Sequence, residues 1–108
     1  MIDYFRYKKL KPTRSDKIRK SAKGKECTLQ IHGVCNQNPE TVVLCHLSSP
    51  TKGMGIKSDD HWGVYGCSNC HAWLDGNYAS VVDRQQLLMN ALYWTQKILI
   101  EEGLITIE

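Results

Sequence analysis

The amino-acid sequence predicts one small α+β domain preceded by a short basic arm. Extended segments of strand-like composition alternate with helical segments, and an amphipathic helix closes the chain. Five cysteines add a third observation, because a chain of 108 residues buries only a thin core and gains stability from cross-links. We therefore expect an arm over residues 1–15 and a single domain over residues 16–108.

The composition is that of an ordinary globular protein, with 42% hydrophobic and 23% charged residues. These values exclude collagen-like, low-complexity and disordered chains. No apolar run approaches the roughly 18 residues of a membrane span, and the first residues lack the apolar core of a signal peptide. We expect a cytoplasmic protein with no membrane partner.

The basic residues are concentrated at one end of the chain. Residues 1–25 hold ten of the fourteen Lys and Arg against two acids, a net charge of +8, and the rest has four bases against nine acids, a net charge of −5. Clustered cations favour a polyanion such as DNA, because they displace counterions from its phosphate backbone. A solvated tail is the alternative. The expected phosphate contacts are Arg19, Lys20, Lys23 and Lys25.

The first helix is expected over residues 15–25. Ser15 or Asp16 suits its N-cap, and Gly24 suits its C-terminal end. The few apolar residues of this helix must face the core while its lysines stay in solvent. The docking residues are Ile18 and Ala22.

Two extended segments follow at residues 27–31 and 41–47, separated by a loop rich in turn-forming residues. The second segment places His46 at the end of a β-strand. A glycine-containing loop is expected over residues 48–60, and another short strand over residues 62–65. Three extended segments therefore precede the remaining helices.

Two helices complete the chain. The first, at residues 68–76, puts His71 and Asp75 four positions apart, so that both side chains lie on one face. The second runs from about residue 83 to residue 102, and Gly103 ends it. Its expected buried stripe is Leu87, Leu88, Ala91, Leu92, Trp94, Ile98 and Leu99, with Met89 and Tyr93 in core or edge packing.

Four of the five cysteines form two pairs. Seven residues separate Cys27 from Cys35, and two separate Cys67 from Cys70. A CxxC pair at a strand-to-helix turn lets two thiolates bind one tetrahedral ion, and a second pair completes the site. An odd cysteine count in a reducing compartment favours metal ligation over disulfides, so we expect structural Zn²⁺. Cys45 is left over and is expected to be a small buried hydrophobic residue.

Two other chemistries share part of this cysteine pattern. A thioredoxin-like redox pair would need a surrounding βαβ pattern, which the sequence lacks. Residues 67–71, CSNCH, also match the signature of covalent c-type haem attachment, which takes place outside the cytoplasm. Zinc ligation is therefore the favoured interpretation.

Two of the four histidines, His46 and His71, lie where metal-dependent chemistry would need them. A strand-end histidine that faces His71 and Asp75 suits a site that holds one divalent ion and activates a water. Neutral imidazole accepts a proton near pH 7, and the ion stabilises charge on a phosphate. A structural role for His46 is the alternative. The loop residues His32 and His61 are expected to have no direct role.

The order of these features resembles the HNH or ββα-metal nucleases, also called His-Me finger endonucleases. Residues 19 to about 103 are more narrowly similar to the small prophage-encoded family typified by YbcO. The matching segments are RKSAKGKEC (19–27), GVCNQNPET (33–41), LCHL (44–47), GMGIK (53–57) and GVYGCSNCHAWLDG (63–76). The resemblance implies a zinc-braced ββα-metal finger with a basic N-terminal helix and a long C-terminal helix.

The resemblance also implies a metal-dependent DNA endonuclease that acts in phage or prophage DNA processing and leaves 5′-phosphate and 3′-hydroxyl ends. It implies that His46 is the general base and that His71 and Asp75 hold a catalytic ion. A carboxylate ligand suits Mg²⁺ or Mn²⁺. Asp60 is the nearest candidate to orient the base, and the adjacent Asp59 is the alternative.

The sequence departs from the nuclease pattern at Cys45, where many members carry a metal ligand, which leaves the ion a ligand short or dependent on water. Lys52 and Lys57 flank the GMG loop and are expected either to contact phosphate or to be solvated. The alternative function is a non-catalytic zinc-containing module that binds nucleic acid or recombination proteins. A homo-oligomer could form through an edge strand at residues 104–108.

Overall fold

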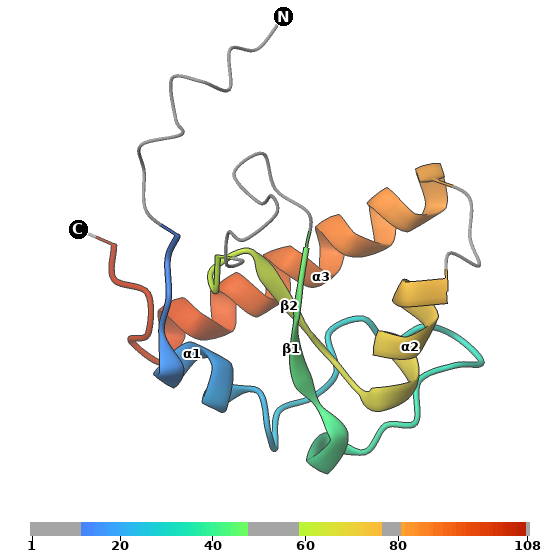
Figure 1. Ribbon diagram of the computed structural model, residues 1–108, viewed down its shortest axis with the longest axis horizontal. Helices are drawn as coiled ribbons and strands as arrows, with labels where there is room; N and C mark the ends of the chain where they lie inside the picture. Colours follow the sequence, from blue (N-terminus) through green and yellow to red (C-terminus); the bar gives the residue numbers. More distant parts are fainter. Residues whose placement is uncertain (1–11, 48–58, 77–80, 108) are drawn as a thin grey trace, which may run out of the picture.

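The structure is a computed structural model that describes residues 12–47, 59–76 and 81–107. Within these residues a two-stranded sheet lies among three α-helices (Figure 1). In chain order the elements are α1 (Asp16–Ser21), the 3₁₀ helix η2 (Pro39–Thr41), β1 (Val43–His46), β2 (Gly63–Gly66), α2 (Ser68–Gly76) and α3 (Val81–Glu101). The predicted α+β class is confirmed, whereas most of the predicted loop at residues 48–60 lies outside the described residues.

The strands β1 and β2 are antiparallel, and their register pairs Val43 with Gly66 and His46 with Gly63. His46 is the last residue of β1, as predicted. Glycine is required at position 66, because a Cβ there would lie 2.7 Å from Cys45 Sγ. The small residues of β2 thus let the two strands and their buried side chains approach closely.

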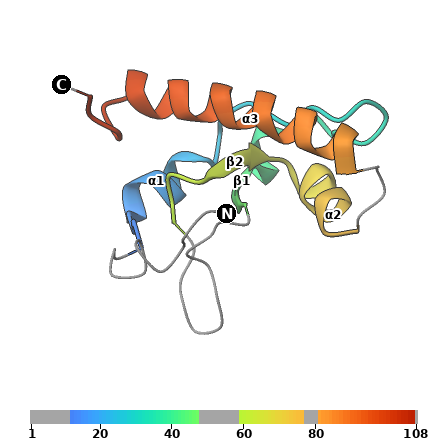
Figure 2. The same ribbon diagram turned by 90° about the horizontal axis from the view of Figure 1, so that it is seen from above.

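The helix α3 covers one face of the sheet, while α1 and α2 flank the strands on the other side (Figure 1, Figure 2). The fully buried Tyr65 of β2 joins these layers. Its hydroxyl lies 2.7 Å from Ser21 Oγ of α1, and its backbone N–H donates to Thr95 Oγ1 of α3 at 3.1 Å. A polar network therefore holds the sheet between α1 and α3.

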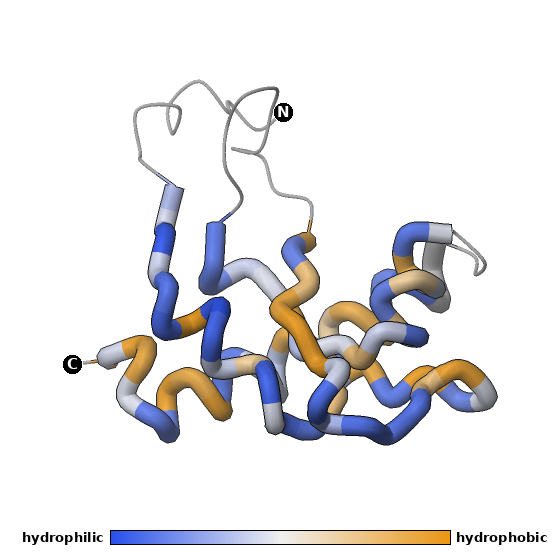
Figure 3. The backbone as a smooth tube through the Cα atoms, turned by 60° about the horizontal axis from the view of Figure 1, so that its bottom comes forward, coloured by the Kyte–Doolittle hydropathy of each residue, from blue (hydrophilic) through white to orange (hydrophobic). Residues whose placement is uncertain are grey.

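The helix α1 begins as predicted. Ser15 is its N-cap, and the Ser15 hydroxyl accepts a hydrogen bond from Ile18 N at 3.2 Å. Ile18 and Ala22 are buried, and Gly24 follows with a φ of 89° that favours glycine. Figure 3 shows a mostly hydrophilic α1 beside hydrophobic residues of the sheet. The basic helix therefore docks through one apolar side only.

The prediction of an extended segment at residues 27–31 is wrong, because no strand forms there. Gln30 has a φ of 42°, in the left-handed region that strands do not use. Thr28 N–H donates to Tyr65 O at 2.8 Å, so the segment touches β2 without pairing along it. Its alternating apolar residues are nevertheless buried, because the turn points both Cys27 and Leu29 inward.

The helix α3 runs close to its predicted bounds, but part of its predicted stripe is wrong. Trp94 is 59% exposed, whereas the neighbouring Thr95 is fully buried. Adjacent helical residues point about 100° apart, so the stripe through Ala91 and Leu99 includes Thr95 and leaves Trp94 outside. Met89 and Tyr93, which were expected in core or edge packing, are also exposed. Among the described residues no helix is both long and apolar enough to cross a membrane.

The described part of the C-terminal tail folds back on α3 and forms no edge strand. Gly103 has a φ of 73° and ends the helix, as predicted. The backbone amides of Leu104 and Ile105 both donate to Leu99 O, at 2.9 and 3.2 Å. Both side chains pack against the core, so this segment extends the hydrophobic cluster of its own chain.

Candidate functional site

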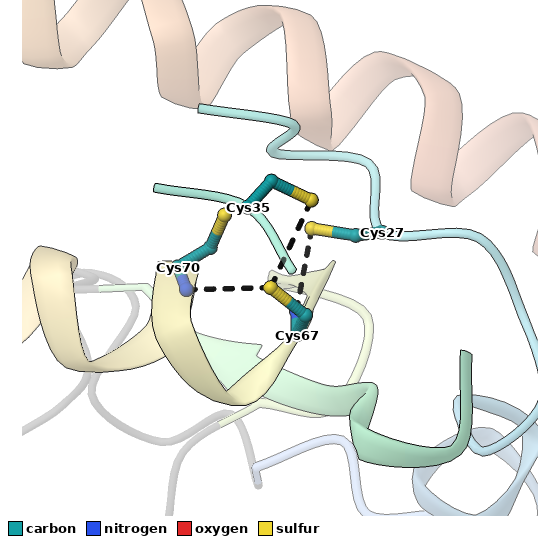
Figure 4. A group of neighbouring side chains, drawn as sticks. All are labelled: Cys27, Cys35, Cys67 and Cys70. Atoms are coloured by element: carbon teal, nitrogen blue, oxygen red, sulfur yellow. Dashed lines mark hydrogen bonds between the residues drawn. The ribbon is translucent and has the colours of Figure 1, made fainter. Parts of the chain in front are cut away.

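The four paired cysteines meet at the start of α2, and we call this group the cysteine cluster. Cys67 and Cys70 lie at the beginning of α2, whereas Cys27 and Cys35 come from the loop segment that precedes β1 (Figure 4). All four sulfur atoms lie within 4.8 Å of one another. The predicted convergence of the two pairs is confirmed.

The spacing of the sulfur atoms fits a tetrahedral metal ion. With Zn–S bonds of about 2.3 Å, the sulfur atoms of a tetrahedral site lie roughly 3.8 Å apart. The Sγ atoms of Cys67 and Cys35 are 3.8 Å apart. The donor set is soft and mostly buried, as structural zinc requires. These residues could therefore hold a metal ion such as zinc.

Backbone amides donate hydrogen bonds to two sulfur atoms of the cluster. Gln30 N and Cys67 N donate to Cys27 Sγ at 3.4 and 3.3 Å. Burial raises the pKa of Cys67, but the amides of Asn36 and Cys70 donate to its sulfur, and the pKa falls to about 7. Burial raises the pKa of Cys70, so a bound cation is needed before all four sulfurs can ionise.

Cys45 does not belong to the cluster. It is 2% exposed, and its sulfur faces the backbone of Gly66. Burial, followed by the charge of the Cys27 thiolate, raises the pKa of Cys45 to about 12. A thiol in this environment stays neutral, which agrees with the predicted role of a small buried hydrophobic residue.

A second group of polar residues lines a cleft of about 640 Å³ between β1, α2 and α3. We call it the histidine cleft. Its polar lining includes His46 from β1, His71 and Asp75 from α2, and Arg84 from α3. Its apolar lining includes Trp62, Leu74, Leu88 and Leu92. The structure thus brings together both histidines that the sequence singled out.

Asp60 anchors the imidazole of His46 from beneath the cleft. The Asp60 side chain is fully buried, and its Oδ1 lies 2.8 Å from His46 Nε2. A buried carboxylate accepts hydrogen bonds, so the proton of neutral His46 resides on Nε2. Nδ1 is then left with a free lone pair that can accept a proton from water.

The segment before α1 completes the environment of Asp60. Ser15 N donates to Asp60 Oδ2 at 2.6 Å, Arg14 Nη1 lies 3.4 Å from Oδ1, and Arg19 forms a further ion pair. Burial raises the pKa of Asp60, but the Ser15 amide, His46 and the two guanidinium groups outweigh burial and leave the pKa below its ordinary value. Asp60 is therefore ionised at neutral pH.

The neighbouring Asp59 holds a different part of the chain. Its Oδ1 accepts a hydrogen bond from Thr13 N at 2.7 Å, and Thr13 O accepts one from Asp60 N at 2.7 Å. These bonds tie residues 12–15 to the loop that precedes β2. Of the two aspartates that the sequence left open, Asp60 is the one bonded to His46.

His71 and Asp75 lie one helical turn apart on α2, as predicted. The distance from His71 Nε2 to Asp75 Oδ2 is 3.9 Å. Their side chains are 45% and 76% exposed, so both can reach a solvent ion at the mouth of the cleft. An imidazole and a carboxylate on one helical face are suitable ligands for a divalent cation.

The predicted phosphate contacts differ in exposure and in their ion-pair partners. Arg19 pairs with Asp16 and Asp60, and Lys25 Nζ lies 2.9 Å from Glu102 Oε2. Lys20 and Lys23 are exposed, with Lys23 4.0 Å from an exposed glutamate. The remaining predicted contacts, Lys52 and Lys57, lie outside the described residues.

Sequence reasoning missed two arginines near the histidine cleft, Arg14 and Arg84. Arg14 was counted only as part of the basic arm, although it pairs with Asp60. No role was predicted for Arg84. Its position was nevertheless a signal, because a base in the first turn of a helix opposes the helix dipole and needs another reason to be there.

Comparison with known proteins identifies the family. The profile of the family described as "Putative nuclease YbcO" matches residues 16–104. Two curated relatives with that name, from Escherichia coli strain K12 and Enterobacteria phage 82, are each 36% identical over 91 residues, which cover 82% of this chain and 95% of theirs. A solved structure described as a putative bacteriophage protein from Escherichia coli K-12 is similar with a TM-score of 0.67 and 35% identity, covering 81% of this chain and 100% of that one. The chain therefore belongs to the YbcO family of putative nucleases.

Proposed function

We propose that this protein is a metal-dependent DNA endonuclease of the HNH type, in which β1, β2 and α2 form the ββα-metal finger. The observation that carries the proposal is the hydrogen bond between His46 and the buried Asp60, in a cleft shared with His71 and Asp75. Family membership supports a nuclease, and the geometry supports a particular mechanism.

In this mechanism His46 is the general base. The ionised Asp60 fixes the Nε2–H tautomer, so that Nδ1 takes a proton from the attacking water. His46 is 25% exposed in its side chain, which allows water to reach the ring while Asp60 stays buried. The base is thus positioned from the protein interior and acts toward solvent.

His71 and Asp75 are the residues that would hold the catalytic cation. A hard divalent ion such as Mg²⁺ or Mn²⁺ suits this oxygen-and-nitrogen donor set, and waters would complete its coordination. When bound, the ion would stabilise negative charge on the phosphate and on the leaving oxygen. The cysteine cluster is proposed to bind Zn²⁺ and to fix the start of α2, so that His71 keeps its place.

The proposed substrate is DNA, bound through its phosphate backbone. The exposed Lys20 and Lys23 of the basic segment are available for sequence-independent contacts. Arg19 contributes less directly, because its guanidinium already pairs with Asp60. Lys52 and Lys57 remain predicted contacts.

The test is cleavage of supercoiled plasmid by purified protein with Mg²⁺ or Mn²⁺, comparing wild type with His46→Ala. We expect the substitution to slow cleavage by about 100-fold or more, since it removes the general base. The matched control is His32→Ala, an exposed loop histidine outside the cleft, which should cleave normally. Nicks left by wild type should be sealed by DNA ligase if their ends are 5′-phosphate and 3′-hydroxyl.

The alternative is a non-catalytic zinc-containing module. It would be favoured if wild type and His46→Ala both bind DNA but leave it intact with every divalent metal. Cleavage that persists unchanged in His46→Ala would instead point to another base or to a contaminating nuclease. Either result contradicts the proposed role of His46.

A further inference from the structure

Arg84 has a place in the histidine cleft that neither the fold nor the proposed proton transfer explains. It lies in the first turn of α3 and lines the cleft together with His46 and His71. Its Nη2 donates to Leu74 O near the C-terminal end of α2. Its Nη1 is buried and has no hydrogen-bond partner, and it is the one side-chain nitrogen or oxygen of the described residues in that condition.

We infer that Arg84 is a phosphate-binding residue, which contacts the phosphodiester that enters the histidine cleft. The inference rests on the proposed function and extends it by assigning a substrate contact on α3. It is carried by the unpaired Nη1 and by the position of Arg84 beside the proposed base and metal ligands.

The two terminal nitrogens of the Arg84 guanidinium have different surroundings. Nη2 binds the carbonyl of Leu74, where the C-terminal end of α2 carries partial negative charge, and this contact fixes the group in place. Nη1 is buried and unpaired in a residue that lines the cleft, and burying an unpaired charged donor is unfavourable. A ligand that supplies an oxygen acceptor would remove that penalty.

The chemistry of the cleft favours an anionic tetrahedral ligand. Guanidinium groups pair with phosphate through parallel hydrogen bonds and keep their charge at every relevant pH. Asp75, the carboxylate in the cleft lining, pairs with His71 and points largely into solvent. Arg84 is thus left for an external anion.

The test measures DNA binding without turnover. The reference is the His46→Ala protein, which is wild type at position 84. Arg84→Gln and the control Lys97→Gln are added to it, and the affinity of each protein for a short DNA duplex is titrated against salt. Lys97 is an exposed residue of the same helix outside the cleft lining, so its substitution removes the same charge elsewhere. We expect Arg84→Gln to weaken binding about tenfold and to lower the salt slope by about one, and Lys97→Gln to change affinity less than about twofold.

Equal affinity and an equal salt slope for wild type and a folded Arg84→Gln would overturn the inference. If thermal unfolding shows that Arg84→Gln is not folded, Arg84→Lys replaces it. That variant keeps the charge but loses the planar fork, so we expect about threefold weaker binding with an unchanged slope, and wild-type affinity would contradict the inference.

The outcome is independent of whether the protein proves to be a nuclease. Failure of wild type to cleave DNA with any metal would reject the proposed function, while the binding series would still report on Arg84. Conversely, cleavage that requires His46 but has the same KM and rate in Arg84→Gln would reject this inference alone.

Discussion

The cysteine cluster and the histidine cleft both include residues of α2 but differ in exposure. Cys67 and Cys70 are fully buried, whereas His71, the next residue of α2, is 45% exposed in its side chain. The chain thus changes within one residue from a position suited to a structural ion to one suited to substrate. The buried cysteines suit a stabilising role, whereas the exposed His71 suits contact with substrate.

The two regions also differ in how they are held. Much of the cysteine cluster is fixed locally, because amides of Gln30 and Cys70 donate to sulfurs three residues earlier in the chain. His46 depends on Asp60, which in turn depends on residues such as Ser15, 45 positions away. Local spacing can encode the first arrangement, but only the folded chain can produce the second.

The largest expected effect follows from removing one sulfur of the proposed zinc site. We expect Cys70→Ser to abolish zinc binding and the cooperative unfolding transition, because structural zinc contributes about 10–16 kcal/mol in small domains and total stability is about 5–15 kcal/mol. Zinc content by mass spectrometry and thermal unfolding measure both effects.

The matched control for that experiment is Cys45→Ala. Cys45 is also buried, but it lies outside the four-sulfur group, so the variant should keep one zinc per chain. Loss of zinc in Cys45→Ala, or its full retention in Cys70→Ser, would show that the ligand set is different.

The second effect concerns the carboxylate that holds His46. Asp60→Asn should lower the free energy of unfolding by about 1–3 kcal/mol, since it removes the buried charge that accepts hydrogen bonds from Ser15 N, Arg14 and Arg19. Zinc content should not change, because Asp60 does not contact the cysteine cluster. Chemical denaturation with parallel zinc analysis would separate the two regions.

The difference in unfolding free energy between wild type and Asp60→Asn should depend on pH. Folding lowers the pKa of Asp60 below its ordinary value of 3.8, so its contribution is complete above the unfolded pKa and is lost as pH falls through the folded pKa. The difference in unfolding free energy between wild type and Asp60→Asn should be constant above about pH 5 and shrink below about pH 4. A difference that grows on acidification would contradict an ionised Asp60.

A stability loss of intermediate size is expected at Gly66. A Cβ at this position would lie 2.7 Å from Cys45 Sγ and 2.9 Å from Leu29 Cδ1, so Gly66→Ala should cost about 1–3 kcal/mol. Adding Cys45→Ala removes the nearer atom and should recover part of the loss. Strictly additive stabilities in the double variant would rule out this contact.

The smallest effect belongs to the outer face of α3. Trp94→Gln should change stability by less than about 1 kcal/mol, because Trp94 is 59% exposed and packs mainly edge-on against Tyr93, with ring centroids 5.2 Å apart. Leu99→Ala, at a fully buried position, should cost about 2–5 kcal/mol. Equal losses in thermal unfolding would mean that Trp94 is covered in solution.

Much of the fold could be predicted because its signals are local. The N-cap at Ser15, the glycine after α3 and the CxxC at the start of α2 each depend on a few neighbouring residues. The segment at residues 27–31 was mispredicted because its alternating apolar residues suit a strand as well as the turn that forms. Trp94 was misplaced because it lies three residues after Ala91, a spacing that also suits one helical face, whereas the polar Thr95 at four residues gave no hydrophobic signal.

The sequence by itself predicted the α+β class and the grouping of four thiols from residue type and spacing, and it singled out His46, His71 and Asp75 as candidates. Only the tertiary structure decided that Asp60 rather than Asp59 bonds to His46, that Arg19 faces inward and that Arg84 enters the cleft. These contacts join residues from 10 to 41 positions apart. Side chains so far apart meet only after burial of the sheet against α1 and α3 has fixed the path of the backbone.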